Sequence, residues 1–305
     1  MGSPIVCEDL CKRFGRVPAV DHLNLSVPEG SIYALVGPNG AGKTTLIKVL
    51  VNLVRPTSGR ATLLGCDSRK LSAAIFARLG YVSENQELPE WMTVSYFLGY
   101  LKPFYSTWDD TLAGELVRQL DLPRDRKLSA LSRGMKMKAA LASALAFHPQ
   151  LILLDEPFGG LDPLVRDEFI EGLLERAGDS TILISSHDLA EVESFASHVG
   201  FLDAGRMQLS EEITTLTGRF RQIEITVNGA VSLPQNWPAH WLMPEASAPL
   251  IRFIDSRFEE GRTAAEIRQM FPNVANVSIS RLALREIFVA LAKSRRNKSA
   301  KEIAA

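Results

Sequence analysis

Short apolar runs with almost no polar interruption recur along the first two thirds of the chain and predict buried strands. The clearest are residues 31–36, 151–154 and 181–184. Apolar runs without alternation are typical of parallel strands covered on both faces. Each run ends at glycine or polar residues, and ligands bind at the carboxyl ends of such strands. The pattern therefore predicts an α/β domain with a ligand site at one sheet edge.

A different periodicity begins near residue 93 and predicts helices. Leu112, Leu116 and Leu120 recur every four residues, and Ala140 and Ala144 do the same further on. A mostly helical block within an α/β chain predicts an inserted subdomain at about residues 88–150.

Beyond residue 218 the pattern changes again and predicts a small α+β domain over residues 219–294. Strict alternation at 222–227 is typical of a half-buried strand, and 250–254 and 274–279 are two further candidates. Helices are expected at 263–271 and 282–294. The first domain is accordingly assigned to residues 1–218. A basic tail, residues 295–305, could contact anionic lipid, although a solvated, disordered tail is the preferred interpretation.

Composition is ordinary for a folded globular protein, with 46% apolar and 23% charged residues among 305 and a net charge of −1. Three cysteines, Cys7, Cys11 and Cys66, fit a reducing compartment better than a disulfide framework. Cys7 and Cys11 could be a metal pair, but buried small hydrophobes are the favoured interpretation. We expect a cytoplasmic protein, with neither a signal peptide nor a membrane span, and no nucleic-acid partner.

The first candidate functional segment is a phosphate-binding loop between the 31–36 run and a predicted helix. The sequence fits G-x-x-x-x-G-K-[ST], whose glycines let backbone N–H groups converge on a polyphosphate. Lys43 would reach the β- and γ-phosphates of ATP, and the Thr44 hydroxyl would ligate Mg²⁺. The loop residues are Gly37, Pro38, Asn39, Gly40, Ala41, Gly42, Lys43, Thr44 and Thr45.

Three further candidates follow buried strands. Asp155 and Glu156 end the 151–154 run, where one acid could hold Mg²⁺ and the other could orient or deprotonate water. His187 follows the 181–184 run and is expected at the same sheet edge. Phe14 is either a structural ring or a platform that stacks on adenine.

Taken together and in this order, the motifs from about residue 4 to 218 resemble the ATP-binding subunit of an ABC transporter. The resemblance implies a P-loop NTPase core with a β subdomain and an inserted helical subdomain. It makes Glu156 the catalytic carboxylate, His187 the switch histidine and Phe14 the adenine-stacking ring. Asp162 falls in the segment similar to the D-loop. Leu131-Ser132-Arg133-Gly134-Met135 occupies the signature position, so Ser132 and Gly134 would contact ATP held by an opposite subunit.

Two positions depart from the family pattern. The signature has Arg133 and Met135 in place of glycine and glutamine, and Arg133 could contact phosphate or be only a solvated charge. Glu84 stands where the family's Q-loop has glutamine. A carboxylate can also ligate Mg²⁺, so Glu84 joins Thr44 and Asp155 as a candidate ligand. Gln86 is a less favoured substitute because it lies two residues later.

The resemblance implies an ATP-hydrolysing subunit that drives a separate membrane permease, with ABC-2-type exporters the expected group. It also implies a homodimer sharing two ATP molecules, peripheral on the inner face of the membrane. Trp91 would be a permease contact or, with equal weight, a core residue. The alternative is an ABC-type ATPase acting on ribosomes or DNA. It is disfavoured because the chain has one phosphate loop and no sustained heptads.

Overall fold

The structure is a computed structural model that describes residues 2–84, 86–228, 233–234 and 236–303. The chain divides into two compact units, Met1–Ser210 and Glu211–Ala305. The sequence pattern placed this boundary at residue 218, and the interval between the two positions contains helix α7, Ile213–Arg219. Each unit is described by itself. Among the described residues, no helix is both long and apolar enough to cross a membrane.

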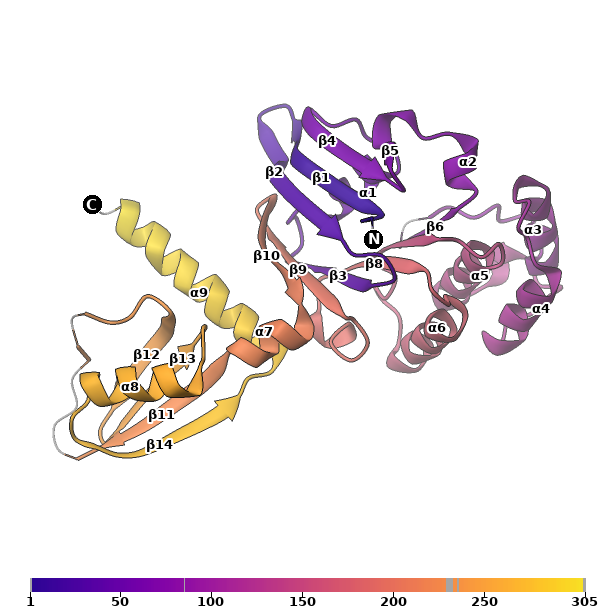
Figure 1. The fold of residues 1–305 in the computed structure, drawn as a ribbon. Helices are drawn as coiled ribbons and strands as arrows, with labels where there is room; N and C mark the ends of the chain where they lie inside the picture. Colours follow the sequence, from indigo (N-terminus) through magenta and orange to yellow (C-terminus); the bar gives the residue numbers. More distant parts are fainter. Residues whose placement is uncertain (1, 85, 229–232, 235, 304–305) are drawn as a thin grey trace. The chain divides into compact units, whose positions relative to one another are not determined.

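A six-stranded sheet of order β10-β9-β3-β8-β7-β6 forms the centre of the first unit (Figure 1). Strands β3, β7 and β8 are almost wholly buried, as their apolar runs predict. Strands β9, β3, β8, β7 and β6 each pair in parallel with their neighbours in this series. The strands are β3 Ile32–Val36, β6 Leu79–Ser83, β7 Leu151–Asp155, β8 Thr181–Ser186, β9 His198–Asp203 and β10 Arg206–Glu212.

Parallel register brings the ends of four strands to one edge. Val36 pairs with Ser186, Asp155 pairs with Ser185, and Ser83 pairs with Asp155. The residues that follow these strands therefore start from the same edge of the sheet.

An antiparallel sheet of order β2-β1-β4-β5 forms the second layer of this unit. Its buried side chains join those of helix α1, Lys43–Leu50, and of β3 and β7 in one hydrophobic core. Strand β1 shifts register after Cys7 and again after Leu10, which marks β-bulges against β2. The strands are β1 Ile5–Phe14, β2 Val17–Val27, β4 Ser58–Leu63 and β5 Cys66–Asp67.

The predicted helical block contains α3, Val94–Leu101, α4, Asp110–Gln119, and α5, Arg133–Leu145. Asp109 caps α4 by accepting from two backbone N–H groups, and α5 is buried along most of its length. The remaining helices of the first unit are α2 Ala73–Phe76 and α6 Pro163–Arg176, with 3-10 turns at Ser68–Lys70, Lys102–Phe104, Leu128–Ala130 and Leu189–Glu191.

The second unit is an antiparallel sheet of order β12-β13-β11-β14 with helices, the α+β arrangement predicted. Its core combines aliphatic side chains with an aromatic group, in which Trp241 is stacked on Phe253 and Trp237 is edge-on to both. Strand β12 was not predicted, because only its first two residues are buried. The elements are β11 Arg221–Val227, β12 Trp241–Ser247, β13 Leu250–Asp255, α8 Glu260–Met270, β14 Val274–Arg281 and α9 Leu284–Ile303.

Helix α9 differs from the sequence-based expectation of a disordered tail. It continues through residues 295–303 as one helix, while 304–305 lie outside the described residues. Lysine, arginine, alanine and glutamate are good helix formers, and neither glycine nor proline interrupts this segment.

Candidate functional site

The phosphate loop leaves β3 and enters α1 as the motif predicts. Gly40 and Gly42 have φ of 81° and 106°, values that glycine adopts without a Cβ penalty. Helix α1 begins at Lys43, and no side chain caps its N-terminus. Its first N–H groups and its positive dipole end are therefore directed at the loop, where an anion would be stabilised.

Gly37 and Gly42 are also required by packing. A Cβ at Gly37 would overlap the carbonyl oxygen of Leu202, in β9. A Cβ at Gly42 would overlap the carbonyl oxygen of Ala19, in β2. The loop thus lies wedged between two other strands of the first unit.

Lys43 is buried, and its ammonium group is fully occupied. The Nζ atom donates to the carbonyl oxygens of Gly37 and Pro38, at 2.6 and 3.3 Å, so the side chain arches back over its own loop. It also forms an ion pair with Glu156 Oε1 at 3.0 Å. Removing the carboxylate would leave a buried positive charge unpaired, which is costly.

Glu156 has an unusual backbone conformation, and its carboxylate contacts both Lys43 and His187. Its φ is +50°, in the left-handed region that only a few per cent of non-glycine residues occupy. One carboxylate oxygen contacts Lys43, and Oε2 lies 2.8 Å from His187 Nδ1. This hydrogen bond is the main reason that the pKa of His187 is raised above its ordinary value.

Asp155 and its partners form a second polar group, next in the sequence to the Glu156 group of Lys43, Glu156 and His187. It is buried, and its Oδ1 accepts hydrogen bonds from the hydroxyls of Thr44, at 3.0 Å, and Ser185, at 2.9 Å. Burial raises the pKa of Asp155, and the two hydroxyls oppose that shift. A hydroxyl and a carboxylate in contact are hard oxygen donors of the kind that Mg²⁺ prefers.

Ser185 was not among the predicted site residues. Besides donating to Asp155, its hydroxyl accepts from the backbone N–H of Glu156 at 2.9 Å, so it holds both acids in place. The available signal was the position of Ser185 and Ser186 at the end of an apolar strand that lies beside β7.

A pocket of about 360 Å³ collects much of the predicted site. It is lined by loop residues Asn39–Thr45, Glu84, Glu156 and His187, together with Ala19 and Gly159. Its size is within the range of small-molecule sites. Phe14, Trp91, Ser132, Gly134 and Asp162 do not line it.

The predicted signature and D-loop residues have local structural roles in the single chain. Ser132 caps α5 by accepting from the N–H of Met135 at 3.2 Å, and Asp162 caps α6 by accepting from Val165 at 3.1 Å. Gly134 has no room for a side chain, because a Cβ there would lie 2.8 Å from Val165 Cγ1. The starts of α5 and α6 therefore pack closely together.

The two predicted aromatic contacts are both exposed. Phe14 is 52% exposed at the end of β1, with the Lys12 ammonium 4.8 Å from its ring centroid. Trp91 is 65% exposed, with its ring centroid 5.6 Å from that of Tyr96. Trp91 is consequently not a core residue.

The two departures from the family pattern contact each other. The Arg133 guanidinium forms a hydrogen-bonded ion pair with Glu84 Oε1. Both side chains lie against glycines at the start of the segment similar to the D-loop, since a Cβ at Gly159 would meet Glu84 and one at Gly160 would meet Arg133. Glu84 thus has one oxygen bound to Arg133 while lining the phosphate pocket, and Gln86 instead accepts from the N–H of Ser83.

Known proteins share sequence and fold with this chain. A family model described as ABC transporter matches residues 20–159. The bacitracin transport ATP-binding protein BcrA of Bacillus licheniformis is 36% identical over 70% of this chain and 70% of its own. The daunorubicin resistance ATP-binding protein DrrA2 of Streptomyces coeruleorubidus is 34% identical over 77% of this chain and 75% of its own length. A solved ATP-binding subunit of an ABC transporter superposes with a TM-score of 0.64 at 26% identity, covering 71% of this chain and 92% of the other.

The Glu156–His187 contact predicts a measurable titration. Because the carboxylate favours the protonated imidazole, Glu156→Gln should lower the pKa of His187 towards its ordinary value of about 6.5. The stabilisation from this contact is complete below that pH and is lost as pH rises through the raised pKa. NMR titration of the imidazole measures the shift. Glu191→Gln, which removes a smaller contribution, is the matched control, and an equal shift in both variants would contradict the assignment.

The Glu84–Arg133 pair predicts an energetic coupling. In a double-mutant cycle of Glu84→Gln and Arg133→Gln, we expect a coupling of about 0.2–1 kcal/mol in the free energy of unfolding, as for partly exposed pairs. Lys136→Gln removes a charge from the same helix and should not couple with Glu84→Gln.

The same variants, together with Glu84→Ala, test the predicted Mg²⁺ role of Glu84. If the carboxylate ligates Mg²⁺, Glu84→Ala should raise the Mg²⁺ concentration for half-maximal hydrolysis, whereas Glu84→Gln, which restores the family's residue, should keep activity. Arg133→Gln, which frees the carboxylate, should not raise that concentration. Coincident Mg²⁺ titration curves for the parent and Glu84→Ala would exclude a ligand role.

Proposed function

The chain belongs to the ABC transporter family of ATP-binding proteins, and on this premise we propose that it hydrolyses ATP at the phosphate pocket to power an ABC-2-type exporter. The observation that carries the proposal is Glu156, held between Lys43 and His187 at the mouth of the loop. The names of its relatives, a bacitracin transport protein and a daunorubicin resistance protein, support export of a peptide or drug. They also disfavour a role on ribosomes or DNA.

The contacts of Lys43 and Glu156 imply an order of events. Polyphosphate drawn to the α1 N-terminus would compete with Glu156 for the Lys43 ammonium. Binding of ATP would therefore release one oxygen of the carboxylate from its ion pair. Glu156 then becomes available as a base at the moment when the substrate is present, while His187 keeps it oriented.

Hydrolysis follows as an in-line displacement. The oxygen of a water molecule forms a bond to the γ-phosphorus, and the bond to the bridging oxygen breaks, so ADP leaves with that electron pair. Glu156 accepts the proton of the attacking water. Lys43 and the loop N–H groups offset the charge on the phosphates. Thr44 and Asp155 would hold Mg²⁺, which supplies further neutralisation of phosphate charge.

A second chain is proposed to complete the site. Ser132 and Gly134 do not line the pocket of their own chain, and they are held at the start of α5 by capping and packing. Two subunits facing head to tail about a two-fold axis could place each signature segment on the other's ATP. The dimer would then close on ATP and open after hydrolysis.

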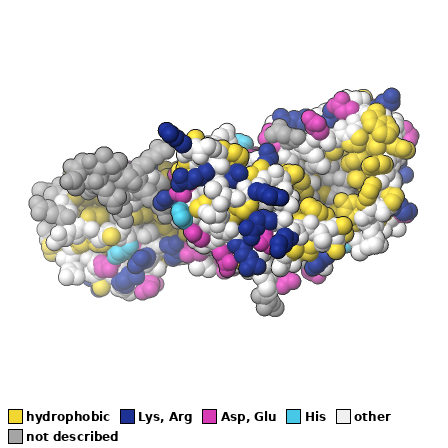
Figure 2. Space-filling view, turned by 90° about the horizontal axis from the view of Figure 1, so that it is seen from above, with side chains coloured by type: hydrophobic (Ala, Val, Ile, Leu, Met, Phe, Trp, Pro, Cys, Tyr) yellow, Lys and Arg dark blue, Asp and Glu magenta, His cyan; other side chains and the backbone are white. Residues whose placement is uncertain are grey.

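An exposed aromatic surface around α3 supports the permease partner. Trp91, Tyr96, Tyr100 and Phe104 are each at least half exposed, and a groove of about 410 Å³ nearby is lined by apolar residues including Leu88 and Phe97. Figure 2 shows hydrophobic side chains gathered at the end of the first unit that carries α3. Exposed aromatic clusters of this kind suit interface anchors. We place the permease here, which would make the protein peripheral on the inner face of the membrane.

The shared-site mechanism predicts the behaviour of Glu156→Gln. Hydrolysis should fall by roughly 10²–10⁴-fold, the usual weight of general-base help. ATP should still bind through Lys43 and the loop amides, so the variant should accumulate as an ATP-loaded dimer in sedimentation with Mg-ATP.

Two further variants control this experiment. Adding Ser132→Arg should return Glu156→Gln to monomer, because it blocks the contact in trans. Lys43→Ala should lower ATP affinity at least tenfold, or about 1.4 kcal/mol, and form no dimer. A Glu156→Gln protein that binds ATP yet stays monomeric at high concentration would refute the mechanism.

The permease surface predicts a separate defect for Trp91→Ala. Because the side chain is exposed, folding and ATP binding should be unchanged while co-purification with the permease weakens. Val289→Ala, at an exposed apolar position of the second unit, is the comparison variant. Undiminished co-purification of Trp91→Ala would place the permease elsewhere.

A further inference from the structure

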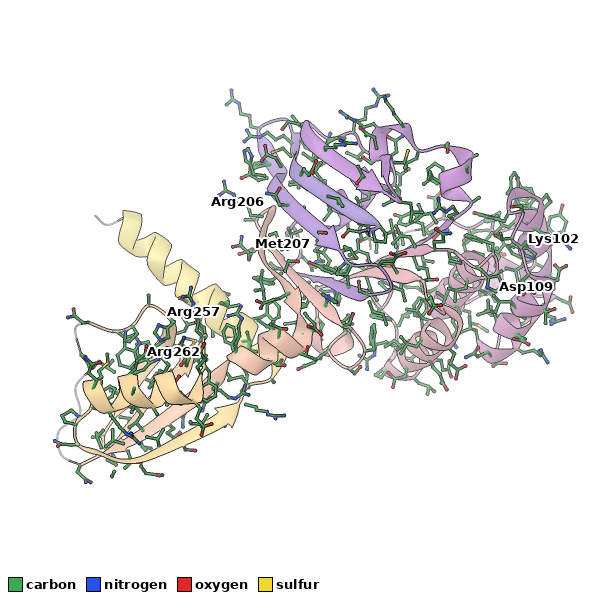
Figure 3. The ribbon with its side chains drawn as sticks, viewed as in Figure 1. Lys102, Asp109, Arg206, Met207, Arg257 and Arg262 are labelled. Atoms are coloured by element: carbon green, nitrogen blue, oxygen red, sulfur yellow. The ribbon has the colours of Figure 1, made fainter. Side chains whose placement is uncertain are left out.

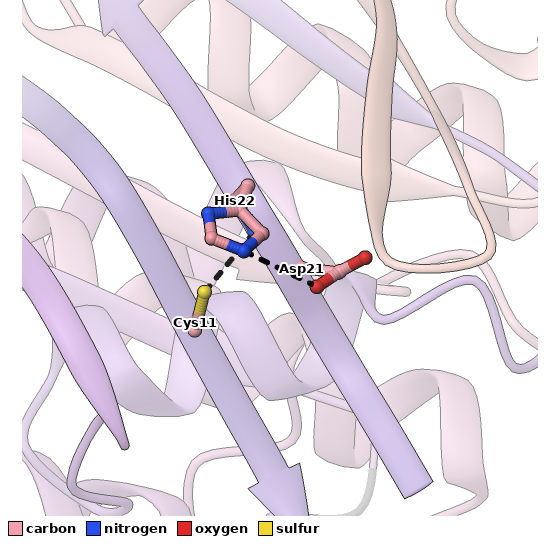
Figure 4. Close-up of side chains that lie close together, drawn as sticks. All are labelled: Cys11, Asp21 and His22. Atoms are coloured by element: carbon pink, nitrogen blue, oxygen red, sulfur yellow. Dashed lines mark hydrogen bonds and ion pairs between the residues drawn. The ribbon is translucent and has the colours of Figure 1, made fainter.

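Three metal-ligand side chains meet where β1 and β2 pair, outside the phosphate pocket (Figure 4). One ligand atom each from Cys11, Asp21 and His22 lies within 4.8 Å of the others, and His22 Nε2 is 4.0 Å from Asp21 Oδ1. We propose that this cluster binds a divalent transition-metal cation, with Zn²⁺ as the preferred ion. The proposal is independent of ATP hydrolysis.

The donor set fits Zn²⁺ chemically. Thiolate, imidazole and carboxylate are all zinc ligands, and three protein ligands leave a fourth position for water. Bonds of about 2.0–2.3 Å in a tetrahedron separate neighbouring ligand atoms by roughly 3.5 Å. The observed atoms lie within 4.8 Å of one another, so they need to approach by up to about 1.3 Å to reach this separation. The His22 ring can move because its side chain is 63% exposed.

Asp9 prepares the histidine for this role. Its Oδ1 lies 2.5 Å from His22 Nδ1, and this contact leaves Nε2 on the side of Asp21. A carboxylate on the far nitrogen is the usual support for a metal-bound histidine. Asp9 and His22 have φ of 46° and 48°, and β1 is bulged on either side of Leu10. These local distortions of the backbone bring the side chains of Asp9 and His22 into contact across the strand pair.

The two carboxylate oxygens of Asp21 have different neighbours, because Arg206 binds only one of them. Arg206 is the first residue of β10 and is labelled in Figure 3, and its guanidinium lies 2.7 Å from Asp21 Oδ2. The other oxygen, Oδ1, is the one nearer to His22. With Cys11 as thiolate, the three anionic side chains of Cys11, Asp9 and Asp21 outnumber the two guanidinium groups that act on Asp21, those of Arg206 and Arg13. A net negative charge at the cluster favours a cation.

The thiol is also held in a suitable position. Cys11 is buried, and its Sγ accepts a hydrogen bond from the backbone N–H of His22 at 3.2 Å. A thiolate accepts this bond as well as a thiol does, so metal binding does not have to break it. Cys7, the other cysteine of β1, lies in the hydrophobic core and not in the cluster.

The test is direct metal binding by the full chain, stripped with chelator and free of nucleotide and Mg²⁺. Co²⁺ is the spectroscopic probe, and Zn²⁺ affinity follows from competition. We expect one Co²⁺ per chain with a thiolate-to-metal charge-transfer band, displaced by Zn²⁺. Lys43→Ala should bind equally, which separates this site from the nucleotide site.

Variants identify the ligands. Cys11→Ser should abolish the charge-transfer band, whereas Cys66→Ser, at a thiol outside the cluster, should retain it. His22→Gln should fold normally, because the side chain is exposed, and should weaken Zn²⁺ binding at least tenfold. Asp9→Asn should weaken it by about 10–100-fold, as expected for the group that orients a ligand. Absence of stoichiometric binding in the parent, or unchanged binding in His22→Gln, would overturn the proposal.

Discussion

The parallel register of four neighbouring strands is the constraint on which the proposed ATP site depends. Gly37, Glu84, Glu156 and His187 each follow the last residue of a strand, and the pairings of Val36, Ser83, Asp155 and Ser186 bring those ends together. A slip of one residue in β7 would replace Glu156 by Asp155 at the loop and bury the wrong carboxylate. The strands resist such a slip because both of their faces are packed.

Electrostatics then determines what this edge can do. Two acids side by side would repel each other in a buried site, but Lys43 and His187 contact Glu156 while two hydroxyls bind Asp155. The acids are thereby separated into different roles, one poised next to cations and the other suited to a hard metal. Ser185 contributes to both groups, so it couples them through a single hydroxyl.

The extent to which sequence predicts this protein depends on the range of the interactions. The phosphate loop, the buried strands and the alternating β11 are local patterns, and the structure has them where the patterns indicate. The Glu84–Arg133 pair joins residues 49 positions apart, and nothing near either residue signals the other. The Cys11–His22 contact depends on bulges that shift the register of β1, which a spacing rule along one strand does not include. Helix α9 exceeded its predicted end because charge alone suggested disorder, although its residues favour a helix.

The close packing of two phosphate-loop glycines, Gly37 and Gly42, affects how mutant alleles of this protein should be interpreted. Because carbonyl groups of Leu202 and Ala19 fill the space beside Gly37 and Gly42, a larger residue at either position forces the scaffold apart whether or not nucleotide is present. An allele with such a change would lower protein abundance as well as ATP use, and its phenotype would mimic a deletion. Complementation studies that aim to separate the presence of the subunit from its catalytic cycle are better served by Glu156→Gln, which keeps the size of the side chain and adds no atom beside these carbonyl groups.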